Sequence, residues 1–198
     1  MKLNNKKGFT LIELLAVIVI LAILLAIAIP NVAKYINSAR KSTFIENVQS
    51  YASAALKEAY AGNSYALPIN NKEAIAITFD ALKDALEQGG KTSPYGGAWK
   101  SNSFIIIAND GTAESPKFVY YIAAIDEKGY GIGENGNAIV KLNDELKESD
   151  IIQIGANSDG IGVEQAASDK GLCVRTVYES TNNAGSQVTY GVCPTVTP

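Results

Sequence analysis

The chain contains 198 residues, of which 47% are hydrophobic and 19% are charged, with 17 basic and 20 acidic side chains. This length allows one domain with an extension and excludes two full hydrophobic cores. Because the chain has no histidine, imidazole catalysis and histidine-ligated metal sites are excluded. The acidic excess argues against a nucleic-acid-binding surface.

The apolar residues gather in one run of 21 residues, 9–29, of which two are polar. As a helix this run spans roughly 30 Å, the thickness of a bilayer core. Basic residues before it favour a cytoplasmic N-terminus, and these are Lys2, Lys6 and Lys7. A cleaved secretory signal is the alternative, because Ala26 and Ala28 resemble its small-x-small cleavage site. The run is long for such a signal, so we favour a membrane anchor.

Glu13 does not fit a plain anchor. A carboxylate inside the hydrocarbon is costly and usually has a partner. Two explanations stay open at this point. Either Glu13 lies near enough to the interface to stay hydrated, or a cation reaches it when chains assemble.

Residues 6–13 read Lys-Lys-Gly-Phe-Thr-Leu-Ile-Glu, and the apolar run and Pro30 follow them. This segment resembles the class III signal peptide of type IV prepilins, and the similarity extends as a helical pattern to about residue 60. The Leu-Ile-Glu-Leu-Leu-Ala-Val-Ile stretch also resembles pilins of Gram-positive bacteria. In the remaining 140 or so residues we identify no resemblance to a family.

The resemblance implies a set of processing and assembly residues. Prepilin peptidase, a membrane aspartyl protease, would cut after Gly8 and methylate the new amino group of Phe9. The apolar run would remain as an anchor and become the filament core. Glu13 would pair with the Phe9 amine of a neighbouring subunit, which explains a carboxylate in the hydrocarbon. The expected parts are a leader (1–8), a membrane and filament-core half-helix (9–30), an amphipathic half-helix (31–61) and a globular head (62–198).

Beyond Pro30 the apolar residues recur at three- and four-residue spacing, which predicts an amphipathic helix. We expect one helix from Phe9 to Ala61, ended by Gly62, with two separate helices as the alternative. Proline displaces a carbonyl of the preceding turn, so we expect Pro30 to kink or locally melt the helix. The expected apolar face comprises Val32, Tyr35, Ile36, Ala39, Ile45, Val48, Ala52, Ala55, Leu56 and Ala59.

The head is expected to hold a short helix and several strands. Thr78 is a candidate N-cap for a helix with Phe79, Leu82 and Leu86 on one face, and segment 72–77 stays unassigned. Strands are expected at 104–108, 118–125, 130–132 and 138–142, and a helical turn at 144–147. Several strands after one helix predict an α+β fold with an antiparallel sheet packed on the long helix. This is the type IV pilin fold that the resemblance implies.

Two acidic, glycine-rich stretches, 126–137 and 157–160, are candidate calcium loops. The resemblance draws attention to them, because major pseudopilins of type II secretion carry calcium in this part of the head. Neither stretch has the alternating oxygen ligands of an EF-hand. We therefore expect solvated turns and no metal or cofactor site.

Cys173 and Cys193 lie in two strand-like segments near the C-terminus. A hairpin between these segments would place Cys173 opposite Cys193 and Val177 opposite Thr189, within disulfide range. Two free thiols are the alternative. A head outside the membrane favours the disulfide, which also matches the C-terminal loop of many pilins. The enclosed stretch 179–186 is a candidate partner-facing surface.

The sequence offers no nucleophile with a histidine base, no phosphate-binding glycine loop and no carboxylate dyad, so we expect no enzymatic activity. The resemblance implies a structural subunit of a type IV pilus, for adhesion, twitching motility or aggregation. The alternative is a pseudopilin of a type II secretion or competence (DNA uptake) system. The size of the head and its disulfide favour the pilus.

The partners that the resemblance implies are other copies of the chain, other pilins, prepilin peptidase, a membrane platform protein and an assembly ATPase. The precursor would sit in the cytoplasmic membrane, with its leader in the cytoplasm and its head outside. After assembly it would form an extracellular surface filament.

Overall fold

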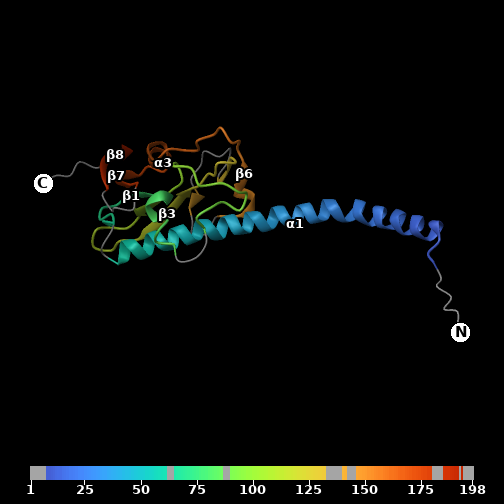
Figure 1. The fold of residues 1–198 in the computed structure, drawn as a ribbon. Coiled ribbons are helices and arrows are strands. Elements are labelled where there is room, and N and C mark those ends of the chain that lie inside the picture. The colour runs from blue at the N-terminus through green and yellow to red at the C-terminus, as the bar shows by residue number, and fades with distance from the viewer. Residues whose placement is uncertain are drawn as a thin grey trace. The chain divides into compact units, whose positions relative to one another are not determined.

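The computed structural model describes residues 8–61, 65–86, 90–132, 140–141, 146–179, 185–191 and 193. The chain divides into two compact units, Met1–Ala39 and Arg40–Pro198. One helix, α1 (Leu11–Tyr60), contributes to both of them (Figure 1). This confirms one long helix in place of two. The expected stop at Gly62 lies outside the described residues.

The first unit is the N-terminal part of α1, and all its described residues are exposed. Pro30 lies inside the helix, which continues through it without a break. Proline disturbs the hydrogen bonds of the preceding turn, and the Asn31 side-chain amide donates to the Ile27 carbonyl there, at 3.1 Å. Of the two expected effects of Pro30, this structure does not show local melting, and the kink stays a prediction.

The second unit is built on a six-stranded sheet with the order β5-β3-β2-β1-β7-β8. Its strands are β1 (Glu73–Thr78), β2 (Phe104–Asn109), β3 (Phe118–Ala123), β5 (Val140–Lys141), β7 (Cys173–Tyr178) and β8 (Ser186–Gly191). A separate pair consists of β4 (Tyr130–Ile132) and β6 (Ile151–Gln153). The α+β fold class is confirmed. The sheet is mixed and not wholly antiparallel, because β1 and β7 run parallel.

Strand β1 was left unassigned by the sequence, yet it lies inside the sheet between β2 and β7. Its alternating residues serve two cores, with Ile75 and Ile77 on one face and Ala74 and Ala76 on the other. Alternation of apolar and polar residues is the usual sign of a strand exposed on one face. Because both faces of β1 are covered, the strand shows no such alternation.

One face of the sheet packs on the second part of α1, Arg40–Tyr60, as expected. The helix residues buried there are Phe44, Val48, Tyr51, Ala52, Ala54, Ala55 and Ala59. Four of them belong to the predicted apolar face, whereas Phe44, Tyr51 and Ala54 were not predicted. Val32, Tyr35 and Ile36 were predicted on that face and are exposed. Burial therefore begins one turn after the start of the second unit.

Among the described residues, the second unit also holds three short helices: α2 (Phe79–Leu82), the 3-10 helix η2 (Glu148–Asp150) and α3 (Val163–Asp169). The Thr78 hydroxyl accepts from the Ala81 amide at 3.4 Å, which confirms the predicted cap of α2. The helix ends four residues earlier than Leu86, which was expected to extend it. Helix α3 was not predicted, and its Ala166 and Ala167 are buried in the core on the other face of the sheet. The helical turn expected at 144–147 lies partly outside the described residues.

Candidate processing and assembly site

The Gly8–Phe9 peptide bond lies just before α1, in a segment that is neither helix nor strand. Gly8 is exposed, and a Cβ added to it would meet no atom within 4 Å. The fold of this chain therefore does not require a glycine there. Phe9 is also exposed, at 88% of its surface. A peptide bond outside a helix and open to solvent has the backbone freedom that a protease needs.

Thr10 and Glu13 form a capping box at the start of α1. The Thr10 amide and hydroxyl both donate to the Glu13 Oε2 atom at 2.8 Å, and the Glu13 amide donates to the Thr10 Oγ1 atom at 3.3 Å. This reciprocal arrangement satisfies backbone donors that a helix start otherwise leaves unpaired. The role of Thr10 was missed, although the Thr-x-x-Glu spacing is the sequence sign of such a cap.

In this chain, with its leader attached, the Glu13 carboxylate accepts hydrogen bonds within its own helix. An amino group at Phe9 exists only after cleavage of the Gly8–Phe9 bond. The pairing of Glu13 with a neighbour's Phe9 amine therefore stays a prediction. The leader residues Lys2, Lys6 and Lys7 lie outside the described residues.

Residues 14–29 of α1 are apolar on every side, and α1 is long and apolar enough there to cross a membrane. Among the described residues it is the one helix with this property, and none of its most apolar window is buried. A helix that is apolar on all sides is normally buried in a large core or in lipid. A surface of this kind is suited to a cover of lipid or of other chains.

The two cysteines are joined in a disulfide, Cys173–Cys193, with their Cα atoms 4.6 Å apart. The predicted register of the hairpin is wrong, however. Cys173 lies opposite Gly191, and Val177 lies opposite Ser186 in place of Thr189. The pairing shifts between Val174 and Thr176, as expected where a bulge adds a residue to one strand.

The enclosed stretch 179–186 lies mostly outside the described residues, and its predicted contact with a partner stays a prediction.

Gly191 has a φ of +79°, and a Cβ there would lie 1.9 Å from the Leu172 carbonyl oxygen. A glycine at this position thus lets β8 approach the start of β7.

Asp126 begins the first glycine-rich stretch and is fully buried, so the expectation of a solvated turn is wrong at this residue. Its carboxylate accepts hydrogen bonds from the Ser93 hydroxyl and, at 2.9 Å each, from the amides of Lys128 and Tyr130. A buried carboxylate needs such donors to offset its lost hydration. Asp126 therefore ties two loops of the head together.

The ammonium group of Lys100 lies at the second glycine-rich stretch, 157–160. The Lys100 Nζ atom donates to the carbonyls of Ala156 and Ser158 at 2.8 and 2.6 Å and lies 3.6 Å from Asp159. Among the described residues, no group of three or more acidic or cysteine side chains is placed to hold a metal ion. A side chain from another part of the head thus supplies positive charge to this loop.

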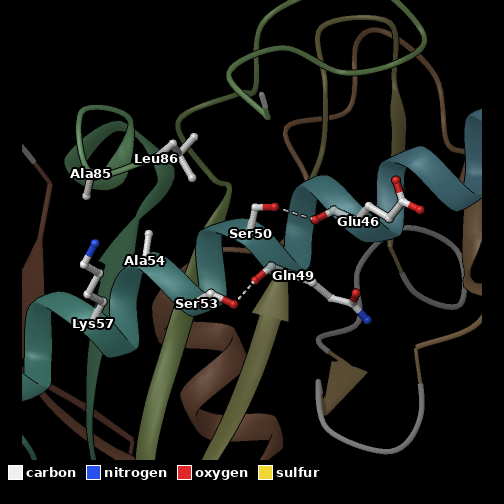
Figure 2. Close-up of a pocket in the computed structure, with 8 residues that line it drawn as sticks. All are labelled: Glu46, Gln49, Ser50, Ser53, Ala54, Lys57, Ala85 and Leu86. Atoms are coloured by element: carbon white, nitrogen blue, oxygen red, sulfur yellow. Dashed lines mark hydrogen bonds between the residues drawn. The ribbon is translucent and has the colours of Figure 1, made fainter. Parts of the chain in front are cut away.

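A groove of about 520 Å³ runs along the exposed side of α1 in the second unit. Figure 2 shows its lining residues, which are Glu46, Gln49, Ser50, Ser53, Ala54, Lys57, Ala85 and Leu86. The Ser50 and Ser53 hydroxyls donate to the carbonyls of Glu46 and Gln49, each at 2.9 Å. Because these hydroxyls bond to their own helix, they do not form a converging set of catalytic groups.

Comparison with known proteins places the similarity in the N-terminal segment. The prokaryotic N-terminal methylation motif matches residues 3–29. A ComG operon protein 3 homolog from Bacillus licheniformis is 57% identical over 37 residues, which make up 19% of this chain. The match spans only 38% of that relative's length. No solved structure matches the chain.

Proposed function

We propose that this chain, which carries the prokaryotic N-terminal methylation motif on a type IV pilin-like α+β architecture, is a filament subunit of a type IV pilus. It is made as a membrane-anchored precursor, is cleaved after Gly8 and methylated at Phe9, and then polymerises through the first part of α1. The head stays outside the membrane and forms the surface of the filament.

The observation that carries this proposal is the exposed apolar run of α1 directly after an accessible Gly8–Phe9 bond. Soluble monomers rarely expose large continuous apolar surfaces. A membrane covers this surface before assembly, and the same helices of neighbouring subunits cover it in a filament. One segment therefore serves as anchor and as polymerisation surface, which requires that processing leaves it in place.

Glu13 gives this polymerisation its register. Moving a carboxylate from water into an apolar medium is costly, and an opposite charge recovers much of that cost when the geometry is good. A subunit added in register brings a Phe9 amine to Glu13, whereas a misplaced one leaves a charge unpaired. In the precursor, the Thr10 hydrogen bonds satisfy part of the Glu13 carboxylate.

The proposal requires partners that supply chemistry and energy. Prepilin peptidase supplies the cleavage and methylation, and an assembly ATPase with a membrane platform protein drives extraction from the membrane. Other pilins join the filament. Adhesion, surface motility and aggregation are the activities that such a filament serves.

Two variants test this proposal in cells that produce the chain as their sole filament subunit. Gly8→Leu is expected to give an uncleaved precursor in the membrane and no filaments. Glu13→Ala is expected to be cleaved normally, because it keeps the Gly8–Phe9 bond. It is expected to assemble poorly, because the register of assembly depends on the Glu13 carboxylate. Immunoblots of membrane and sheared fractions measure both. Normal filaments from Gly8→Leu would contradict the cleavage assignment.

A pseudopilin of a secretion or competence system is the second candidate, and the similarity to a ComG operon protein 3 homolog favours it. Mass spectrometry of fibres sheared from the cell surface separates the two. A pilus subunit is expected to dominate the sheared fibres. A processed chain that stays in the membrane fraction would support the pseudopilin.

A further inference from the structure

A short basic segment, residues 30–45, separates the apolar run from an acidic head. It contains three basic side chains and no acidic one, and these are Lys34, Arg40 and Lys41. Residues 46–198 contain 11 basic and 19 acidic side chains, which gives that part of the chain a formal net charge of −8. Positive charge is therefore concentrated directly after the most apolar part of α1.

The position of the basic segment along α1 places its first cation at the level of lipid headgroups, given the membrane anchoring proposed above. The apolar run ends at Ile29, and a helix rises about 1.5 Å per residue, so Lys34 and Tyr35 lie roughly 8 and 9 Å beyond it. The headgroup layer on each side of the hydrocarbon core is roughly 5–8 Å thick. Helical side chains tilt toward the N-terminus of their helix, which is the membrane side here, so the Lys34 ammonium group reaches this layer.

Lys34 and Tyr35 present their side chains to the surroundings of the chain. Both are exposed, Tyr35 at 76% of its surface, and within the part of the chain that the structure describes Lys34 has no hydrogen bond or ion pair. The other two cations have contacts with the head. The Arg40 guanidinium lies over a tyrosine ring, and the Lys41 Nζ atom donates to the Glu148 carbonyl at 3.0 Å. Lys34 is therefore the cation of this segment that can take an external partner.

We infer that the basic segment binds the phosphate headgroup of an anionic phospholipid at the outer surface of the membrane, with Lys34 in contact with the phosphate. Basic side chains next to a span are attracted to anionic lipid, and no carboxylate between Glu13 and Glu46 opposes this attraction. A zwitterionic headgroup would bring its own cation close to Lys34. Tyr35 suits the same depth, because tyrosine is enriched at membrane interfaces. Bound lipid would fix the depth of the anchor before assembly.

The test uses the full processed chain in nanodiscs made from equal amounts of phosphatidylglycerol and phosphatidylcholine. Native mass spectrometry of the chain released from the discs counts the molecules of each lipid that stay bound. The expected result is about fivefold more phosphatidylglycerol than phosphatidylcholine. Equal retention would overturn the inference, leave the anchoring intact and favour the acidic head of another copy as the partner. A chain that does not enter the discs would overturn the inference together with the proposed anchoring.

A matched pair of variants links the lipid preference to Lys34. Lys34→Gln removes one charge and is expected to lower the retained phosphatidylglycerol about fivefold. Lys57→Gln removes one charge from another exposed lysine of α1, beyond the basic segment, and is expected to behave as the wild type does. The Phe9 amine is the same in all three chains, so it cannot cause a difference between them. A preference that Lys34→Gln leaves unchanged, or that both variants weaken equally, would overturn the inference.

Discussion

In α1 the more apolar part is exposed, whereas the more polar part is partly buried. The first part, Leu11–Ala39, is the more apolar, and every one of its residues is exposed. The second part, Arg40–Tyr60, carries many polar residues, yet it buries Phe44 and Tyr51 and also all four of its alanines. Within one continuous helix, the chain thus provides an internal partner for the less apolar part only.

This difference indicates two kinds of stabilisation. The second part of α1 is fixed by a sheet of the same chain, so its packing depends on the sequence of the head. The first part has no packing partner within the chain and is suited to contacts with lipid or with other copies. Its properties are therefore set by its own local sequence. Substitutions in the two parts are expected to have effects on different properties, and this can be measured.

The largest difference is expected between Phe44→Ala and Leu24→Ala. Phe44 has 0% of its surface exposed and contacts Trp99 with ring centroids 4.9 Å apart, whereas Leu24 is 57% exposed. Loss of a buried phenylalanine costs about 3–5 kcal/mol. We expect that loss in the free energy of unfolding of the head for Phe44→Ala and almost none for Leu24→Ala. Urea unfolding in micelles, followed by Trp99 fluorescence, measures both, and equal losses would contradict the comparison.

Removal of the disulfide is expected to come next. The Cys173→Ala/Cys193→Ala double variant opens a ring closed over a sequence separation of 20 residues. The chain-entropy estimate gives a loss of about 3 kcal/mol in the free energy of unfolding of the head. Membrane insertion through the first part of α1 should not change. Non-reducing mass spectrometry checks the bond independently, because the bonded chain is lighter by two hydrogen atoms.

Two glycines of the head, Gly129 and Gly96, allow a matched comparison of alanine substitutions. Gly129 and Gly96 have φ angles of +79° and +83°, so alanine is strained at both. A Cβ at Gly129 would lie 2.1 Å from the Gly155 carbonyl carbon, whereas one at Gly96 meets nothing within 4 Å. We expect Gly96→Ala to cost about 1 kcal/mol. Gly129→Ala should cost clearly more in thermal unfolding, and equal costs would show that the close approach is unimportant.

The smallest effect concerns pH. Glu73 at the start of β1 pairs with Arg175 at 2.5 Å and accepts from the amides of Ile69 and Asn70. Burial opposes ionisation of Glu73, but these amides and the guanidinium outweigh it and lower the pKa of the carboxyl. The resulting stabilisation is fully present above the unfolded pKa of glutamate, about 4.3. It is lost as the pH falls through the lower folded value.

Glu73→Gln should therefore flatten the dependence of the melting temperature on pH in this acidic range. Asp159→Asn is the control, because the Asp159 side chain is largely exposed and lies 3.6 Å from its lysine partner. A wild-type melting temperature that stays constant as the pH falls through this range would contradict the assignment.

Local patterns made the N-terminal part predictable. The apolar run is specified by neighbouring residues and the long helix follows from its periodicity, whereas the roles of Gly8, Phe9 and Glu13 stay predictions. Thr10 was missed although its signal is equally local. The strands β2, β3 and β4 were also predicted, because each is a short apolar run bounded by turns.

The missing features depend on residues far apart in the sequence. Strand β1 pairs with β7 about one hundred residues later, so nothing near Glu73 indicates that the two strands are parallel. The buried state of Asp126 depends on Ser93, and the loop at Ala156 depends on Lys100. The register of the cysteine hairpin was wrong because the position of its turn cannot be derived from spacing alone. Cys173 already lies opposite Gly191, two residues before Cys193, and the shift after Val174 adds one more residue.

We propose that processing removes the leader and keeps the first part of α1. Mass spectrometry of the mature chain, purified from its native cells, tests this most directly. We predict an N-terminal peptide that begins with N-methylated Phe9 and continues into the apolar run. A mature chain that begins after Ala28, without the apolar run, would contradict the claim, as would one that still begins at Met1.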